Sequence, residues 1–74
     1  MNSAESRVAF LQILIERVRH ARHPSATHMA MIEQALPPQL VPDYVEVLLE
    51  KVANDPSPSI PMLQRIERLL DAAR

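Results

Sequence analysis

Seven prolines and no glycine punctuate this chain of 74 residues. The prolines stand at positions 24, 37, 38, 42, 56, 58 and 61, and they separate four blocks that each show helical periodicity. Because proline fixes φ and removes a backbone donor, each break is a stiff corner. The lack of glycine argues against glycine-rich phosphate loops, dinucleotide-binding turns and nucleophile elbows. We therefore expect an all-α fold, a compact four-helix bundle with short proline-defined corners.

The length of the chain predicts a single helical domain over residues 1–74. Hydrophobic residues make up 47% of the sequence, which is too many for a disordered chain. Phe10 and Tyr44 are the only aromatic residues, so the core must be mainly aliphatic. There is no cysteine to form a disulfide. A core of this size contributes roughly 3–5 kcal/mol, and we expect oligomerisation or docking onto a larger protein to supplement it.

Apolar spacing and capping residues predict helices over about residues 3–23, 25–36, 42–54 and 59–73. Ser25 and Ser59 are the expected N-caps of the second and fourth helices. Asn54 is expected to end the third helix in a left-handed conformation. Residues 39–41 are expected to form an extended corner, since a residue that precedes proline disfavours the helix.

The first predicted helix is long, and its apolar arc is too wide for contact with one neighbour. We therefore expect it to be the central element. Phe10 and Ile13 widen the arc beyond the main stripe, and they are candidate partner-binding residues. The apolar positions of this helix are Val8, Phe10, Leu11, Ile13, Leu14, Ile15, Val18 and Ala21.

Two groups of charged residues are the other candidate partner-binding residues. A basic group stands at the end of the first helix, and an acidic group lies on the outer face of the third. Cations collect at helix C-termini to complement the backbone carbonyls, which remains an alternative explanation of the basic group. Opposite charges could orient a partner or pair two copies of the chain. The groups are Arg17, Arg19 and Arg22, and Asp43, Glu46 and Glu50.

Three histidines raise the question of a metal site. His20 and His23 are one turn apart, and His28 lies beyond a proline corner. Without thiolates or a His-Glu-x-x-His pattern, they give weak support for a metal. Ser25 with His28 lacks a loop that could stabilise an oxyanion. We expect no catalytic residue, no metal, no cofactor and no small-molecule substrate, and hence no enzyme.

Two segments resemble parts of known families. Residues 54–70, with the sequence NDPSPSIPMLQRIERLL, resemble the last helix of phage-repressor-type helix-turn-helix regulators, which implies DNA binding. Residues 23–40, with a helix that ends in Leu-Pro-Pro, resemble small helical effector-associated adaptors of bacterial defence and signalling proteins. That resemblance implies association of helical domains with no active site. The chain is assigned to neither family.

The predicted function is a small helical protein–protein interaction module, with an adaptor, docking or regulatory role. The alternative is a helix-turn-helix transcription regulator. In such a regulator, the third helix would have to enter the major groove of DNA. This helix carries three acidic residues and only one basic residue, Lys51, so it would repel the DNA phosphates. We therefore expect another protein or a second copy as partner, and no nucleic acid. The apolar stretch 8–15 is too short to span a membrane, so we expect no membrane contact and a cytoplasmic location.

Overall fold

A computed structural model describes residues 1–73 of the chain. It contains four α-helices and one short 3-10 helix, and residues 1–73 include no strand. The all-α class with four helices is therefore confirmed. None of the helices in this part of the chain combines the length and the apolarity needed to span a membrane. The elements are α1 (Ser3–His20), α2 (Ala26–Ala35), η1 (Pro38–Leu40), α3 (Val41–Ala53) and α4 (Ile60–Ala72).

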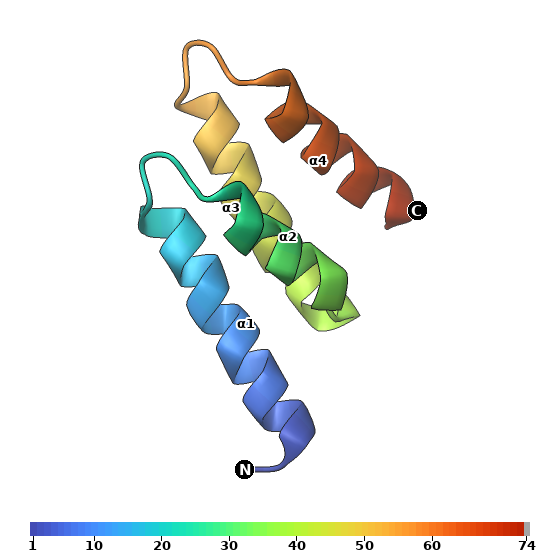
Figure 1. The fold of residues 1–74 in the computed structure, drawn as a ribbon. Coiled ribbons are helices and arrows are strands. Elements are labelled where there is room, and N and C mark those ends of the chain that lie inside the picture. The colour runs from blue at the N-terminus through green and yellow to red at the C-terminus, as the bar shows by residue number, and fades with distance from the viewer. Residues whose placement is uncertain (74) are drawn as a thin grey trace. The chain divides into compact units, whose positions relative to one another are not determined.

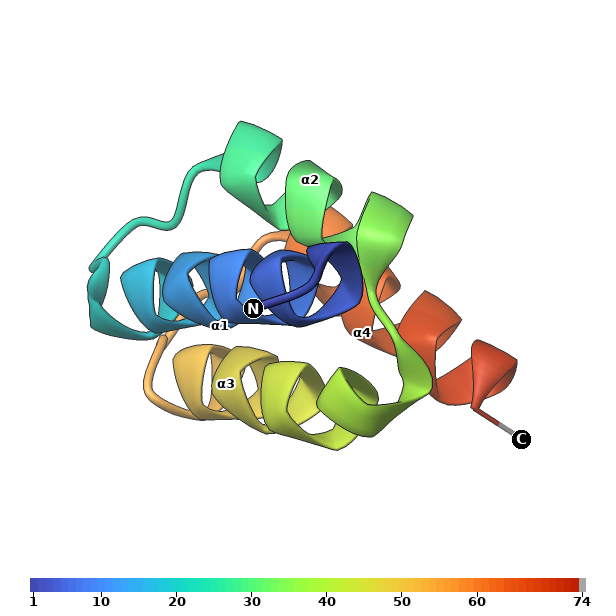
Figure 2. The same cartoon turned by 90° about the horizontal axis from the view of Figure 1, so that it is seen from below.

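The chain consists of two compact units, Met1–Leu40 and a second unit that begins at Val41. Each unit is a helical hairpin: α1 packs against α2, and α3 packs against α4. Figures 1 and 2 show each hairpin from two directions. The single domain over residues 1–74 stays a prediction.

In the first unit, the buried side chains come from one side of α1, from α2 and from η1. The buried positions of α1 recur at intervals of three and four residues, as expected for a helix with one face in a core. This stripe matches the periodicity of the sequence. Its members are Leu11, Leu14, Ile15 and Val18, and they are joined by Met29, Ile32 and Leu40.

The start of α1 is fixed by reciprocal hydrogen bonds between Asn2 and Glu5. Oδ1 of Asn2 accepts a bond of 2.8 Å from the backbone N–H of Glu5, and Nδ2 of Asn2 donates to Oε1 of Glu5 at 3.1 Å. This arrangement satisfies a backbone donor that a helix start otherwise leaves unpaired. The helix starts at residue 3, as the sequence predicts, whereas Asn2 is not among the predicted N-caps.

The end of α1 is His20, three residues before the predicted end. Ala21 has extended backbone angles, and its N–H bonds the carbonyls of Arg17 and Val18 at 3.1 and 3.3 Å. The residue before Pro24 disfavours helical angles, and residues 22 and 23 form a bend. The loop that joins α1 to α2 is therefore longer than predicted.

The corner before α3 is a 3-10 helix, and the prediction of an extended corner at residues 39–41 is wrong. The N–H of Leu40 donates to the carbonyl of Pro37 at 3.0 Å. The fixed φ of proline suits a 3-10 turn as well as an extended segment, so Pro38 is compatible with this conformation. Leu40 is buried, and Val41 is half-buried as the first residue of α3.

In the second unit, the core contains Tyr44, Val47 and Leu48 from α3 and Ile66 from α4. Apolar spacing in the third helix predicts that Leu49 shares the inner face with Tyr44 and Leu48, but its side chain is 45% exposed. Successive residues of a helix are separated by about 100°. With Tyr44 and Leu48 inside, Val47 faces the core and Leu49 turns away from it.

Both serine caps are confirmed. Oγ of Ser25 accepts a bond of 3.3 Å from the N–H of His28, three residues further along α2. Oγ of Ser59 accepts a bond of 3.2 Å from the N–H of Met62 in α4. Each bond satisfies one of the free donors at a helix start.

The left-handed cap predicted at Asn54 is wrong. No residue in the described part of the chain has a positive φ. Instead, Nδ2 of Asn54 donates to the carbonyl of Glu50 at 3.0 Å, and the backbone N–H of Asn54 donates to the same carbonyl at 3.1 Å. The carbonyl of Glu50 lies in the last turn of α3, and the bond from the Asn54 side chain takes the place of the bond that the N–H of a left-handed capping residue would donate.

Candidate interaction site

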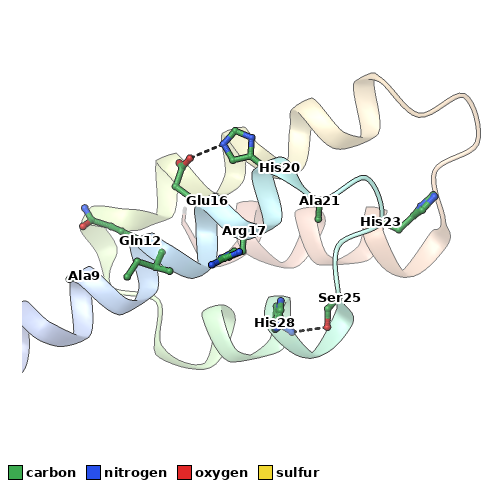
Figure 3. A pocket seen from close by; sticks show the side chains of 10 residues that line it. Ala9, Gln12, Glu16, Arg17, His20, Ala21, His23, Ser25 and His28 are labelled. Carbon is green, nitrogen blue, oxygen red and sulfur yellow. Dashed lines mark hydrogen bonds and ion pairs between the residues drawn. The ribbon is translucent and has the colours of Figure 1, made fainter.

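A broad, open groove of about 930 Å³ lies beside the C-terminal half of α1 and the start of α2. Within it, α1 contributes Ala9, Ile13 and Arg17, and the loop and α2 contribute Ser25 and His28. Figure 3 shows that most of the lining side chains belong to α1. All of the lining residues lie in the first unit.

The α1 side of the groove follows from helical spacing. Ala9, Ile13 and Arg17 are separated by four residues each, and Gln12, Glu16 and His20 form a parallel row. Residues at this spacing share one side of a helix. These rows lie away from the buried stripe of α1, so the groove is formed by the face that the core leaves uncovered.

Two large apolar side chains on this face are exposed. Ile13, in the groove, is 57% exposed, and Phe10, three residues before it, is 50% exposed. Single exposed apolar residues are ordinary on protein surfaces. Phe10 and Ile13, however, are neighbours on one helix beside an open groove. Together they form an apolar surface that a partner could bury.

The charge of the groove depends on how Glu16 is paired. Its Oε1 lies 3.1 Å from Nε of Arg19, and its Oε2 lies 3.4 Å from Nε2 of His20. Arg17 forms no ion pair within the first unit. The groove therefore presents an arginine cation beside an apolar surface, while the neighbouring carboxylate already has its own partners.

The three arginines predicted as one basic patch have different surroundings. Arg17 is exposed and lines the groove. Arg19 is half-buried and bound to Glu16. Arg22 is exposed in the loop after α1. Of the three, the structure places only Arg17 together with Ile13, on the same side of α1.

The acidic residues predicted on the third helix, Asp43, Glu46 and Glu50, are all exposed on α3. Their spacing of three and four residues puts them on one face of the helix. That face lies away from the buried Tyr44 and Leu48.

The three histidines do not converge. His20 is directed to Glu16, His23 is on the loop, and His28 is on α2, where its backbone bonds Ser25 (Figure 3). Within residues 1–73, no three or more histidine, cysteine or acidic side chains are grouped so that they could hold a metal ion.

Ala9 and Gln12 belong to the groove but were not among the predicted site residues. Ala9 lies four residues before Ile13, so helical spacing from Ile13 is the signal that could have found it. Gln12 lies one residue before Ile13, a spacing that gives no such signal. The sequence raises His20 and His28 as metal ligands, and His28 also as a partner of Ser25; the structure places both histidines at the groove.

Comparisons with protein-family models, with curated proteins and with solved structures find no match for this chain. The geometry of the α1 face is therefore the basis on which a function can be inferred. That geometry consists of an open groove, two exposed apolar side chains and one arginine without an ion pair in its unit.

Proposed function

We propose that this chain is a small helical protein–protein interaction module with an adaptor, docking or regulatory role in the cytoplasm, and that it has no catalytic activity. The observation that carries the proposal is the exposure of Ile13, at 57%, in an open groove beside Arg17. An apolar anchor next to a cation is a combination that suits a protein surface with an apolar and an acidic part.

The exposed residues of α1 have the spacing of a helix-docking surface. Phe10, Ile13, Arg17 and His20 follow one another at intervals of three, four and three residues, and all four are exposed. We call these four residues the α1 stripe. Intervals of three and four are the pattern by which one helix packs along another, with apolar residues as anchors.

The size of the stripe sets the expected strength of binding. Fully burying a Phe or Ile side chain gives about 1.5–3 kcal/mol, and these two are already about half-buried in the chain. Association also costs several kcal/mol in lost translational and rotational freedom. We therefore expect a reversible complex with a Kd in roughly the micromolar range or weaker.

The test is photo-crosslinking in cells from the side chain at position 13. A benzophenone amino acid replaces Ile13 in the full chain, and the matched control carries it at Gln64, an exposed position of α4. The proposal predicts a discrete protein adduct from position 13, identified by mass spectrometry, that is absent from position 64. The adduct should be lost when Arg17→Glu is added. Equal adducts from both positions, or none from position 13, would show that the α1 stripe binds no protein.

A further inference from the structure

The third helix carries a second exposed stripe with matching periodicity. Pro42, Glu46, Leu49 and Ala53 follow one another at intervals of four, three and four residues, and all four are exposed. We call these residues the α3 stripe. They lie away from the side of α3 that buries Tyr44, Val47 and Leu48. Leu49, at 45% exposure, is the large apolar residue of this stripe.

The two stripes match in order when the helices run antiparallel. Ile13 then faces Leu49, and one turn further along α1, Arg17 faces Glu46. At the other end Phe10 lies against Ala53, where the small side chain leaves room for the ring. An apolar pair and an ion pair therefore form side by side.

The parallel alignment does not give these pairs. It would place Ile13 against Glu46 and Arg17 against Leu49, which sets an apolar side chain against a charge in both cases. Antiparallel alignment also brings opposite helix dipoles together. The sequence of residue types along the stripes therefore selects one direction of pairing.

The charges of the two units are complementary as well. Residues 1–40 contain four arginines, three glutamates and all three histidines, a formal charge of +1 with neutral histidines. Residues 41–74 contain one lysine, three arginines and six carboxylates, a formal charge of −2. Together these give the −1 of the whole chain. The first unit of one copy and the second unit of another thus attract each other.

We propose that the partner of the α1 stripe is a second copy of this chain, bound through its α3 stripe with Ile13 against Leu49 and Arg17 against Glu46. This inference rests on the proposed function and specifies its partner. Each copy carries both stripes, so each can act as acceptor and as donor in the assembly.

The principal test is charge exchange, read as the mass of the full chain in sedimentation equilibrium at low salt. The natural chain should show a mass that rises with concentration and falls with added salt. Arg17→Glu alone and Glu46→Arg alone should each weaken association about tenfold, because each places like charges together. The double variant, and an equimolar mixture of the two single variants, should recover association.

Two variants on α4 serve as controls, Arg68→Glu and Glu67→Arg. Both positions are exposed and lie outside the two stripes, so these variants should associate as the natural chain does. A natural chain that keeps the mass of one copy at all concentrations would overturn the second-copy inference. So would single variants that associate normally, or a double variant that fails to recover. If crosslinking from position 13 still captures a different protein, the proposed function stands without this partner.

The register can be tested by disulfide formation, because the natural chain has no cysteine. Ile13→Cys mixed with Leu49→Cys should form a mixed disulfide under mild oxidation. Ile13→Cys mixed with Glu46→Cys, the pair that a parallel alignment would favour, should form it more slowly. Each chain has one cysteine, so any disulfide must join two copies. A faster 13–46 disulfide would overturn the antiparallel register.

Discussion

The carboxylate of Glu16 accepts a hydrogen bond of 3.1 Å from Nε of Arg19, one turn further along α1. The other oxygen of the same carboxylate lies 3.4 Å from Nε2 of His20. This pairing turns Glu16 toward Arg19 and His20, so that its charge is already compensated. Arg17 is next to Glu16 in the sequence, and it remains the arginine that lines the groove.

We predict that Glu16→Gln strengthens self-association two- to threefold at low salt. The change removes a negative charge near Arg17 and so raises the positive potential of the α1 stripe. The free energy of unfolding should change by less than about 1 kcal/mol, because ion pairs of exposed groups contribute little. Sedimentation equilibrium and urea unfolding measure the two effects. Weaker association of the variant would show that Glu16 helps to bind the partner.

Leu48 and Leu49 are adjacent in α3 but should respond to alanine in opposite ways. Leu48 is completely buried, so Leu48→Ala should lower the free energy of unfolding by about 2–5 kcal/mol. This loss is comparable to the whole stability expected for so small a protein, and helicity measured by circular dichroism should fall markedly at room temperature. Leu49→Ala should cost less than about 1 kcal/mol, because the side chain is 45% exposed.

Comparison of Leu48→Ala with Leu49→Ala also separates an effect on folding stability from an effect on self-association. Leu49→Ala should remain folded and associate less, since Leu49 is the apolar anchor of the α3 stripe. If Leu49→Ala associates as the natural chain does, the α3 stripe is not the contact surface. If it unfolds, the side chain has a larger role in the core than its exposure indicates.

Much of the fold follows from local chemistry that is visible in the sequence. Serine before an amphipathic block predicts a helix start, and both Ser25 and Ser59 perform that role. The buried positions of α1 follow from apolar spacing. The choice between Val47 and Leu49 does not follow, because both are apolar neighbours of Leu48. Which one is buried depends on what packs against α3, and that is a tertiary property.

The candidate site was only partly predictable for the same reason. Phe10 and Ile13 stand out in the sequence because they widen an apolar arc, and both are exposed in the structure. Proximity in the sequence suggests that the three arginines form one patch, yet Arg19 is bound to Glu16 and Arg22 lies beyond the end of the helix. Side-chain pairing and the exact end of α1 decide which arginine meets the groove, and neither is encoded in spacing alone.

The capping serine of α4 offers a test with a close control. Ser59→Ala should lower the free energy of unfolding by about 1 kcal/mol, because the N–H of Met62 loses its acceptor. Ser57→Ala should have little effect. In the structure the backbone N–H of Ser57 bonds Oδ1 of Asp55 at 2.9 Å, and that bond does not need the serine side chain. Equal effects in urea unfolding would show that Ser59 does not cap α4.

Zinc should leave the stability of the chain unchanged. The three histidines point in different directions, so a metal ion could not bind them together without rearrangement of the loop (Figure 3). A ligand that binds the folded state raises the melting temperature, because it stabilises that state by an amount that grows with the logarithm of the ligand concentration divided by Kd. Thermal unfolding with excess Zn²⁺ and with a chelator should give the same midpoint. A higher midpoint with Zn²⁺, lost in His20→Ala, would establish a metal site.

Duplex DNA is the partner implied by the resemblance of residues 54–70 to helix-turn-helix regulators, and we predict that the chain does not bind it. The exposed face of α3 carries Asp43, Glu46 and Glu50, which repel phosphates. Fluorescence anisotropy of a labelled duplex of mixed sequence at low salt should therefore show no binding. The matched control neutralises the face with Asp43→Asn, Glu46→Gln and Glu50→Gln; salt-sensitive binding by this variant alone would support repulsion as the cause. Salt-sensitive binding by the natural chain would instead favour a DNA-binding regulator over an interaction module.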